Sequence, residues 1–155
     1  MVENTDQLGD IREACCWPPA GKRGVGFSRA NLFGENFDDY FLEAQQPVLV
    51  AMIESVKAIE NLESILAGEG LDSILIGPYD LSASLGITGD FSDKVFIDAL
   101  TDIKEKASAA NIPCGVHVIQ PSPAELEAHI KDGYRFLAYS IDTVFLRSIM
   151  SRPDV

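Results

Sequence analysis

Four short, almost continuously apolar runs restrict the fold of this chain more than any other feature. They span residues 48–53 (VLVAMI), 73–76 (SILI), 114–119 (CGVHVI) and 136–140 (FLAYS). A strand that is exposed on one face alternates between apolar and polar residues, and these runs do not alternate. We therefore expect strands that are buried on both faces, as in a parallel sheet.

Segments with helical periodicity separate these runs. Apolar residues recur every three or four positions from Val56 to Leu66 and again from Val95 to Ala107. A third helix is expected after Ser122, which has the type of an N-cap residue and is followed by Pro123 and by Glu125, which completes a capping box. The repeated strand–helix order predicts an α/β fold, either an open doubly wound sheet or a (β/α) barrel.

The remaining segments are shorter or less regular. We expect helices over residues 6–15, 37–44 and 143–150, and a long loop rich in glycine, proline and arginine over residues 17–36. A long loop in a compact domain is usually functional or disordered. Because 155 residues are enough for one ordinary domain, residues 1–155 are interpreted as a single domain.

Charge and cysteine content narrow the possible partners and the compartment. The net charge of −12 argues against nucleic acid and anionic membranes, since both require basic patches. No apolar stretch approaches the about 20 residues of a membrane span, and the first residues do not resemble a signal peptide. Cys15, Cys16 and Cys114 lack a CxxC spacing and fit free thiols in a reducing compartment. We therefore expect a cytoplasmic protein.

Carboxylates follow two consecutive strands of the expected sheet. Glu54 comes directly after the first apolar run, and Asp80 comes shortly after the second. The carboxyl ends of parallel strands share one edge, where active sites of α/β proteins lie. Two close carboxylates stay ionised only with a cation or base between them, and such a pair suits Mg²⁺ or Mn²⁺. The alternative is that each carboxylate simply caps the following helix, since acidic residues are favoured at helix N-termini.

Four other residues are weaker candidates. A single His on an apolar strand, as at His117, is more often a structural residue than a catalytic one. Asp142 is expected to be the N-cap of the last helix. Arg23 and Arg29 flank a glycine-rich loop, and they contact either an anionic substrate or the loop itself.

Three stretches resemble the HpcH/HpaI aldolase family: WPPAGKRGVGFSRANLFG (17–34), VAMIES (50–55) and LDSILIGPYDLSASLGITGDF (71–91). This family contains metal-dependent class II aldolases that release or use pyruvate, such as 4-hydroxy-2-oxoheptanedioate aldolase and 2-dehydro-3-deoxyglucarate aldolase. Its fold is a (β/α)₈ TIM barrel, usually assembled into hexamers that exchange their C-terminal helices. The resemblance therefore implies a barrel fold and a homo-oligomer.

The same resemblance assigns roles to individual residues. Glu54 and Asp80 match the two protein ligands of the family's divalent metal, which is Mg²⁺ or alternatively Mn²⁺ or Co²⁺. Gly77, Pro78 and Tyr79 match the loop that receives the pyruvate carboxylate. The implied reaction is the cleavage of a 4-hydroxy-2-oxo acid to pyruvate and an aldehyde through a metal-stabilised enolate. A relative of the citrate lyase β-subunit that acts on acyl-CoA is disfavoured by the net charge.

The chain departs from the family in one site residue and in length. Met52 stands where family members usually carry Gln. A (β/α)₈ barrel has about 250 residues and at least about 200, whereas this chain has 155 and resembles the family only from the fourth strand onward. We therefore expect a partial barrel of about strands 4 to 8.

This partial match leaves the catalytic residues unassigned. The family's catalytic His and substrate-binding Arg lie on earlier strands, and no residue here corresponds to them. The sequence is a fragment, or another chain supplies the missing half, or the chain is a natural truncation that self-associates. The alternative function is therefore an incomplete aldolase that keeps metal binding or only self-association.

Overall fold

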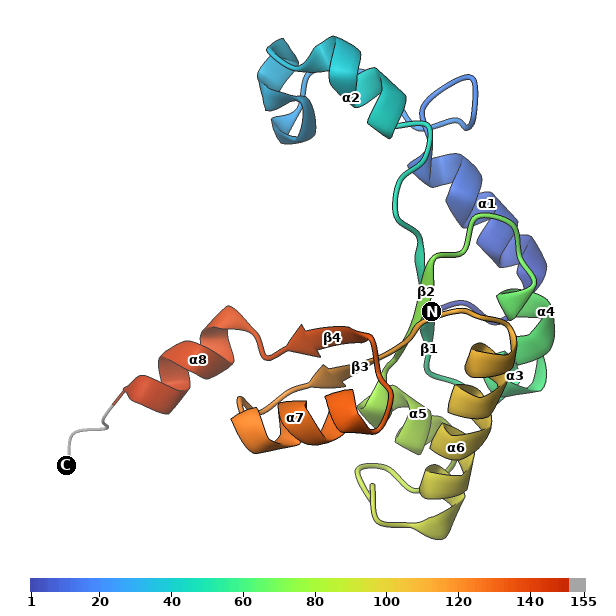
Figure 1. The fold of residues 1–155 in the computed structure, drawn as a ribbon, viewed down its shortest axis with the longest axis vertical. Coiled ribbons are helices and arrows are strands. Elements are labelled where there is room, and N and C mark those ends of the chain that lie inside the picture. Colours follow the sequence, from blue (N-terminus) through green and yellow to red (C-terminus); the bar gives the residue numbers. More distant parts are fainter. Residues whose placement is uncertain (151–155) are drawn as a thin grey trace.

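Four parallel strands form the centre of the molecule in a computed structural model that describes residues 1–150 (Figure 1). Their order in the sheet is β1 (Val50–Ile53), β2 (Ser73–Ile76), β3 (Cys114–Val118) and β4 (Phe136–Tyr139). All neighbouring strands pair in parallel, so their carboxyl ends reach the same edge. The prediction of a parallel α/β sheet built from the four apolar runs is confirmed.

The helices lie between the strands or at the two ends of the chain. They are α1 (Thr5–Cys15), the 3₁₀ helix η1 (Arg29–Gly34), α2 (Phe37–Glu43), α3 (Val56–Glu60), α4 (Leu62–Leu66), α5 (Pro78–Ser84), α6 (Lys94–Ala109), α7 (Pro123–Lys131) and α8 (Asp142–Ile149). As expected, Ser122 caps α7, because its side chain accepts the N–H of Glu125 at 3.2 Å. None of the helices within residues 1–150 is long and apolar enough to cross a bilayer.

The helix expected from residue 56 to residue 66 is interrupted. Asn61 separates α3 from α4 with non-helical backbone angles. Its side-chain amide donates to the carbonyl oxygens of Glu3 and Lys57, each at 3.0 Å. The apolar stripe continues through the break, and for this reason the periodicity alone predicts one helix.

The loop expected over residues 17–36 contains the helix η1. Asn31 organises this turn from a fully buried position. Its Oδ1 accepts the N–H groups of Ser28 at 2.8 Å and of Gly34 at 3.2 Å, and its Nδ2 donates to the oxygen of Gly26 at 2.7 Å. Hydrogen bonds from one side chain to the backbone thus hold this turn. They leave no periodic pattern in the sequence, and for this reason the sequence predicts only a loop.

The two faces of the sheet differ in burial. Ile53, Ile76 and Val116 are in register and face the helices, with exposed fractions of 0%, 0% and 6%. Side chains alternate between the faces of a sheet, so the neighbouring row points the other way. In that row Met52 and Phe136 are 36% and 39% exposed. Between them in the same row, Leu75 is half-buried and Gly115 is buried. The expected burial is therefore only partly found on this face of the described chain.

The partial-barrel interpretation predicts about five strands, and residues 1–150 contain four. Beside β1, the N–H of Val2 donates to the oxygen of Met52 at 3.1 Å, and Val2 is 3% exposed. The first residues of the chain therefore extend the edge of the sheet by one backbone hydrogen bond. The described sheet remains open.

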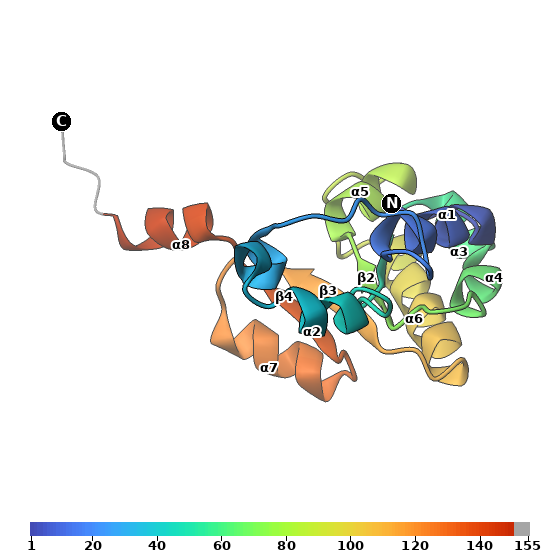
Figure 2. The same ribbon diagram turned by 90° about the horizontal axis from the view of Figure 1, so that it is seen from above.

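Two segments project from this core. The arm (residues 17–44, with η1 and α2) leaves from the amino-terminal side of β1, and α8 extends away from β4 (Figures 1 and 2). No residue of α2 or α8 is buried. Both segments expose large apolar side chains, namely Phe27, Phe33, Leu42, Phe145, Leu146 and Ile149.

Candidate functional site

Glu54 is the first residue after β1 and lies at the carboxyl edge of the sheet. Its side chain is 14% exposed, and its Oε1 lies 3.7 Å from the amino group of Met1. Ser55 is the N-cap of α3, because its Oγ accepts the N–H of Ala58 at 3.2 Å. The helix-capping interpretation of Glu54 is therefore wrong.

Asp80 is the third residue of α5 and is exposed in its first turn. The helix begins at Pro78, whose ring presets the backbone angle φ and whose missing N–H is not needed at a first helical position. This turn was expected to be a loop, and its position directly after β2 places Asp80 at the same sheet edge as Glu54. A helix N-terminus also stabilises an acidic side chain electrostatically. The position of Asp80 therefore agrees both with a metal ligand and with a residue that stabilises the start of the helix.

Gly77 joins the two carboxylate-bearing segments. Its N–H donates to the oxygen of Ile53 at 3.2 Å. A β-carbon at Gly77 would lie 2.6 Å from Oε2 of Glu54 and 3.1 Å from Cβ of Glu54. At the other end of α5, Oγ of Ser84 accepts the N–H of Val56 at 3.0 Å. The structure thus brings Glu54 against the backbone that leads into α5.

The start of α5 also defines which backbone groups can hold an anion. The N–H of Gly77 is already donated to β1, and Pro78 has none. The first hydrogen bond of the helix runs from the N–H of Leu81 to the oxygen of Gly77 at 2.9 Å. The N–H groups of Tyr79 and Asp80 therefore have no acceptor within the helix. Of the three residues expected to receive a carboxylate, only Tyr79 has a backbone donor to offer.

The donor set at this edge fits a hard cation. Glu54 and Asp80 supply carboxylate oxygens, which are the ligands that Mg²⁺ and Mn²⁺ prefer. Within residues 1–150, no cluster of three or more His, Cys, Asp or Glu side chains has a metal-binding arrangement. Mg²⁺ is commonly held by one or two carboxylates and keeps several waters. A two-carboxylate site with open positions agrees with that chemistry.

His117 lies on β3, half-buried on the open face of the sheet. Its Nε2 is 3.4 Å from the backbone oxygen of Ser140. This contact supplies a partner for the ring and agrees with the structural interpretation of this residue.

Asp142 was expected to be the N-cap of the last helix and lies one position after it. The N-cap of α8 is Ile141, and Asp142 is the first residue of the helix. Its Oδ1 accepts the N–H of Thr143 at 2.7 Å. The side chain therefore binds a free backbone donor of the first turn, as a capping residue does, but from inside the helix.

The two arginines of the glycine-rich segment lie on the arm. The guanidinium of Arg23 is 5.5 Å from the ring centre of Trp17 and 5.6 Å from that of Tyr40, and its Nη2 donates to the Tyr40 hydroxyl at 2.9 Å. Arg29 is exposed at the start of η1. Because the arm leaves from the opposite end of β1, the described chain does not bring either arginine to Glu54 (Figure 1). The contacts of Arg23 support its structural interpretation.

Sequence reasoning missed Ser82, which is fully buried in α5. Its Oγ donates to the oxygen of Tyr79 at 2.8 Å and accepts the N–H of Gly89 at 2.9 Å. Ser82 thus holds the first turn of α5 to the loop that follows the helix. The available signal was a hydroxyl residue directly after Leu81 in a segment that had not been assigned as a helix.

Known proteins are similar to this chain in sequence. The chain is 35% identical to a 4-hydroxy-2-oxovalerate aldolase of Rhodococcus jostii, over 94% of this chain and 56% of that protein. It is 34% identical to a 5-keto-4-deoxy-D-glucarate aldolase of Escherichia coli, over 96% of this chain and 57% of that protein. The chain therefore spans little more than half the length of these curated relatives.

Solved structures agree with these relatives. An HpcH/HpaI aldolase/citrate lyase family protein from Burkholderia cenocepacia superposes with a TM-score of 0.83 at 28% identity, over 96% of this chain and 59% of that one. Macrophomate synthase shares the fold, with a TM-score of 0.76 at 21% identity over 96% of this chain and 53% of that one. The family model described as HpcH/HpaI aldolase/citrate lyase matches residues 1–148. The chain belongs to the HpcH/HpaI aldolase/citrate lyase family.

Proposed function

We propose that this chain carries the metal- and pyruvate-binding part of an aldolase that cleaves a 4-hydroxy-2-oxo acid to pyruvate and an aldehyde. The observation that carries the proposal is the packing of Glu54 against Gly77, at the edge where α5 presents Asp80. Membership in a family whose relatives are named aldolases supports this reaction class.

Each group of the site has a role in this proposal. The carboxylates of Glu54 and Asp80 hold a divalent cation, with Mg²⁺ first and Mn²⁺ or Co²⁺ as alternatives. The N–H groups of Tyr79 and Asp80 receive the carboxylate of the 2-oxo acid, and the absence of a side chain at Gly77 leaves room for Glu54. A divalent cation, when bound, supplies Lewis acidity that makes the methyl protons of a 2-oxo acid easier to remove.

The second candidate is a chain that binds the cation and the 2-oxo acid without turnover. The exposure of Met52 and Phe136 on the open face of the sheet favours it. In a complete barrel this face is the packed interior. A site whose interior lacks cover retains solvent, which weakens the electrostatic contribution to catalysis.

The projecting segments support self-association. The arm and α8 expose apolar side chains, and surfaces of this kind mark interaction sites. We therefore include a homo-oligomer in the proposal, with α8 and the arm as the contacts. A cytoplasmic location is proposed with it, in agreement with three cysteines that are all free in the structure.

The test is a calorimetric titration of the purified chain with oxalate, a mimic of the pyruvate enolate, in the presence and absence of Mn²⁺. We expect saturable oxalate binding that requires Mn²⁺ and is lost in Asp80→Asn. The matched control is Asp98→Asn, which removes an exposed carboxylate paired with Lys94 on α6 and should bind like the wild type. Equal binding by Asp80→Asn and the wild type would contradict the assignment of Asp80.

A cleavage assay separates the two candidates. Mn²⁺-dependent oxalate binding together with pyruvate release from a 4-hydroxy-2-oxo acid supports the aldolase. The same binding without pyruvate release supports the chain that binds without turnover.

A further inference from the structure

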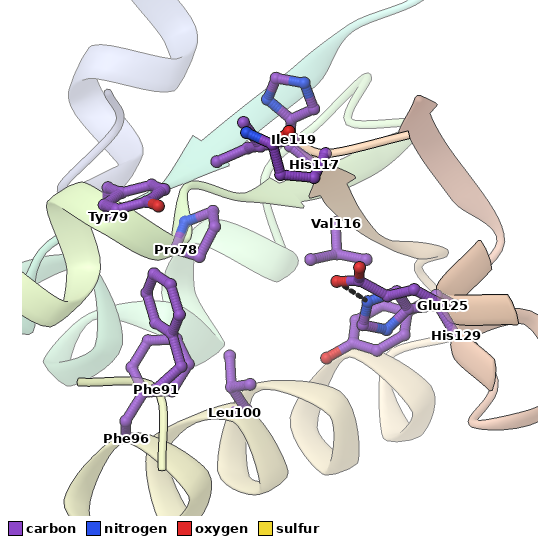
Figure 3. Close-up of a pocket in the computed structure, with 12 residues that line it drawn as sticks. Pro78, Tyr79, Phe91, Phe96, Leu100, Val116, His117, Ile119, Glu125 and His129 are labelled. Carbon is purple, nitrogen blue, oxygen red and sulfur yellow. Dashed lines mark ion pairs between the residues drawn. The ribbon is translucent and has the colours of Figure 1, made fainter. Parts of the chain in front are cut away.

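A cavity of about 300 Å³ lies between α6 and α7, beside the start of α5, and its lining includes His117 near the end of β3 (Figure 3). Val116 of β3 and Ile119 form part of its wall. Neither Glu54 nor Asp80 lines it. The cavity is therefore separate from the cation site proposed above, although Pro78 and Tyr79 contribute to its wall.

Aromatic side chains build one wall of this cavity. The rings of Tyr79 and Phe91 meet edge to face with centres 5.0 Å apart, and Phe91 continues to Phe96 at 5.2 Å. Phe96 belongs to α6 and is 3% exposed. Leu100 lies one turn later on the same helix and continues this wall. Ring pairs of this geometry are mutually stabilising. Together the three rings form an apolar surface.

The opposite wall is polar. In Figure 3 the Glu125–His129 pair stands across the cavity from Phe91 and Phe96. Nε2 of His129 lies 3.7 Å from Oε1 of Glu125, and the His129 ring meets the ring of Tyr134 edge to face at 5.3 Å.

Tyr134 completes the polar wall and lines the cavity. It is 2% exposed, and burial raises the pKa of its phenol, which therefore stays protonated at neutral pH. The polar wall thus offers a carboxylate that only accepts hydrogen bonds, beside an imidazole and a phenol.

We propose that this cavity binds a small aromatic molecule with a hydroxyl group, its ring against Phe91, Phe96 and Leu100 and its hydroxyl directed to Glu125. Ligand sites have volumes of about 300–1,000 Å³, apolar walls and a few convergent polar groups, so this cavity suits a small ligand. A carboxylate acceptor selects a hydrogen-bond donor and disfavours anions. The proposal does not depend on the proposed aldolase function, since it involves neither cation nor 2-oxo acid.

The test compares 4-methylphenol with toluene, which has nearly the same shape but lacks the hydroxyl. Binding is followed by methyl NMR of the full chain without added metal. We expect saturable shifts at the methyl groups of Leu100, Val116 and Ile119, with 4-methylphenol binding more tightly. Methyl groups that do not move at saturating concentrations of either probe would overturn the proposal.

Two pairs of variants locate the binding. Leu100→Trp fills the cavity and should abolish binding of both probes. Its control is Ile97→Trp, which adds the same side chain at a position of α6 that is 50% exposed and does not line the cavity. If Leu100→Trp and Ile97→Trp bind the probes equally, the cavity is not the binding site.

Glu125→Gln tests the polar contact. It should reduce the preference for 4-methylphenol over toluene by about fivefold, because hydrogen bonds to a charged acceptor are stronger than those to an amide. Glu127→Gln, an exposed neighbour on α7 that pairs with Lys131, should keep the preference. An unchanged preference in Glu125→Gln would refute the hydroxyl-bearing ligand class, and this readout remains if Leu100→Trp does not fold.

Discussion

Oε2 of Glu54 lies 2.6 Å from the point that a β-carbon on Gly77 would occupy. The carboxylate and an added side chain at residue 77 therefore compete for one space. The backbone angle φ of Gly77 is −94°, which any residue can adopt. Glycine at this position therefore accommodates the close approach of Glu54 and is not needed for the backbone conformation.

Gly77→Ala is expected to displace the Glu54 carboxylate with little effect on the fold. The new methyl group would also lie 3.1 Å from Cβ of Glu54, so a rotation at the end of the Glu54 side chain does not relieve all of the contact. We expect the affinity for Mn²⁺ with oxalate to fall by about 10- to 100-fold, the size of effect seen when the surroundings of a metal ligand are changed. Calorimetry measures this loss.

Gly9→Ala is the matched control for this substitution. A β-carbon at Gly9 has no heavy atom within 4 Å, and the residue lies inside α1. Replacing a helical glycine by alanine should stabilise the chain by about 0.5–1 kcal/mol and leave Mn²⁺ binding unchanged. If Gly77→Ala binds Mn²⁺ with the wild-type affinity, the contact with Glu54 does not control the site.

Ser82→Ala is expected to destabilise the chain by about 1 kcal/mol, because the N–H of Gly89 and the oxygen of Tyr79 both lose the fully buried Ser82 hydroxyl as a partner. Urea denaturation measures the change. Ser64→Ala is the control, since that hydroxyl is exposed and donates to the oxygen of Asn61 at 2.8 Å. Equal stability of the two variants would show that the hydroxyl of Ser82 has no structural role at the start of α5.

The order of strands and most of the helices follow from local patterns, and for this reason the sequence predicts them. A buried parallel strand needs a continuous apolar run, and an amphipathic helix needs a periodic one. Helix α5 is not predicted by such a pattern. Its residues, PYDLSAS, are short and mostly small, and the helix is held by contacts of Ser82 and Ser84 with distant backbone groups.

The candidate site was only partly predictable for a related reason. The positions of Glu54 and Asp80 follow from strand order, which a sequence reveals. The backbone groups that are free to bind an anion do not follow from strand order, because the N–H of Gly77 is used in a hydrogen bond to Ile53. The cavity beside Phe91 and His129 also depends on how α6 and α7 pack, which no local pattern encodes.

Because of Glu3, the free energy of unfolding is expected to fall in acid. The Ser55 hydroxyl donates to its Oε1 at 3.0 Å, and the Lys57 ammonium lies 3.2 Å from its Oε2. These contacts, the first above all, lower the pKa of Glu3 from its usual 4.5. The unfolded chain therefore binds more protons in acid, and the contribution of Glu3 is lost as the pH falls through 4.5 and below.

Glu3→Gln should flatten this dependence. We expect its free energy of unfolding at neutral pH to be lower than that of the wild type, and the difference to shrink as the pH falls below about 4. Urea denaturation at a series of pH values measures both chains. A difference that stays constant down to about pH 3 would contradict the assignment of the effect to ionised Glu3.

Cys114 is expected to resist alkylation in the folded chain. It is the first residue of β3 and is 8% exposed, and burial raises the pKa of its thiol to about 12. The thiolate is the reactive form, so iodoacetamide at about pH 8 should leave Cys114 unmodified and label it after denaturation. Cys15, half-buried in α1, is the internal reference and should react first. Peptide mass spectrometry measures both rates. Because Cys114 is buried with the helix side of the sheet, fast labelling of Cys114 in the native chain would mean that α6 does not cover β3 in solution.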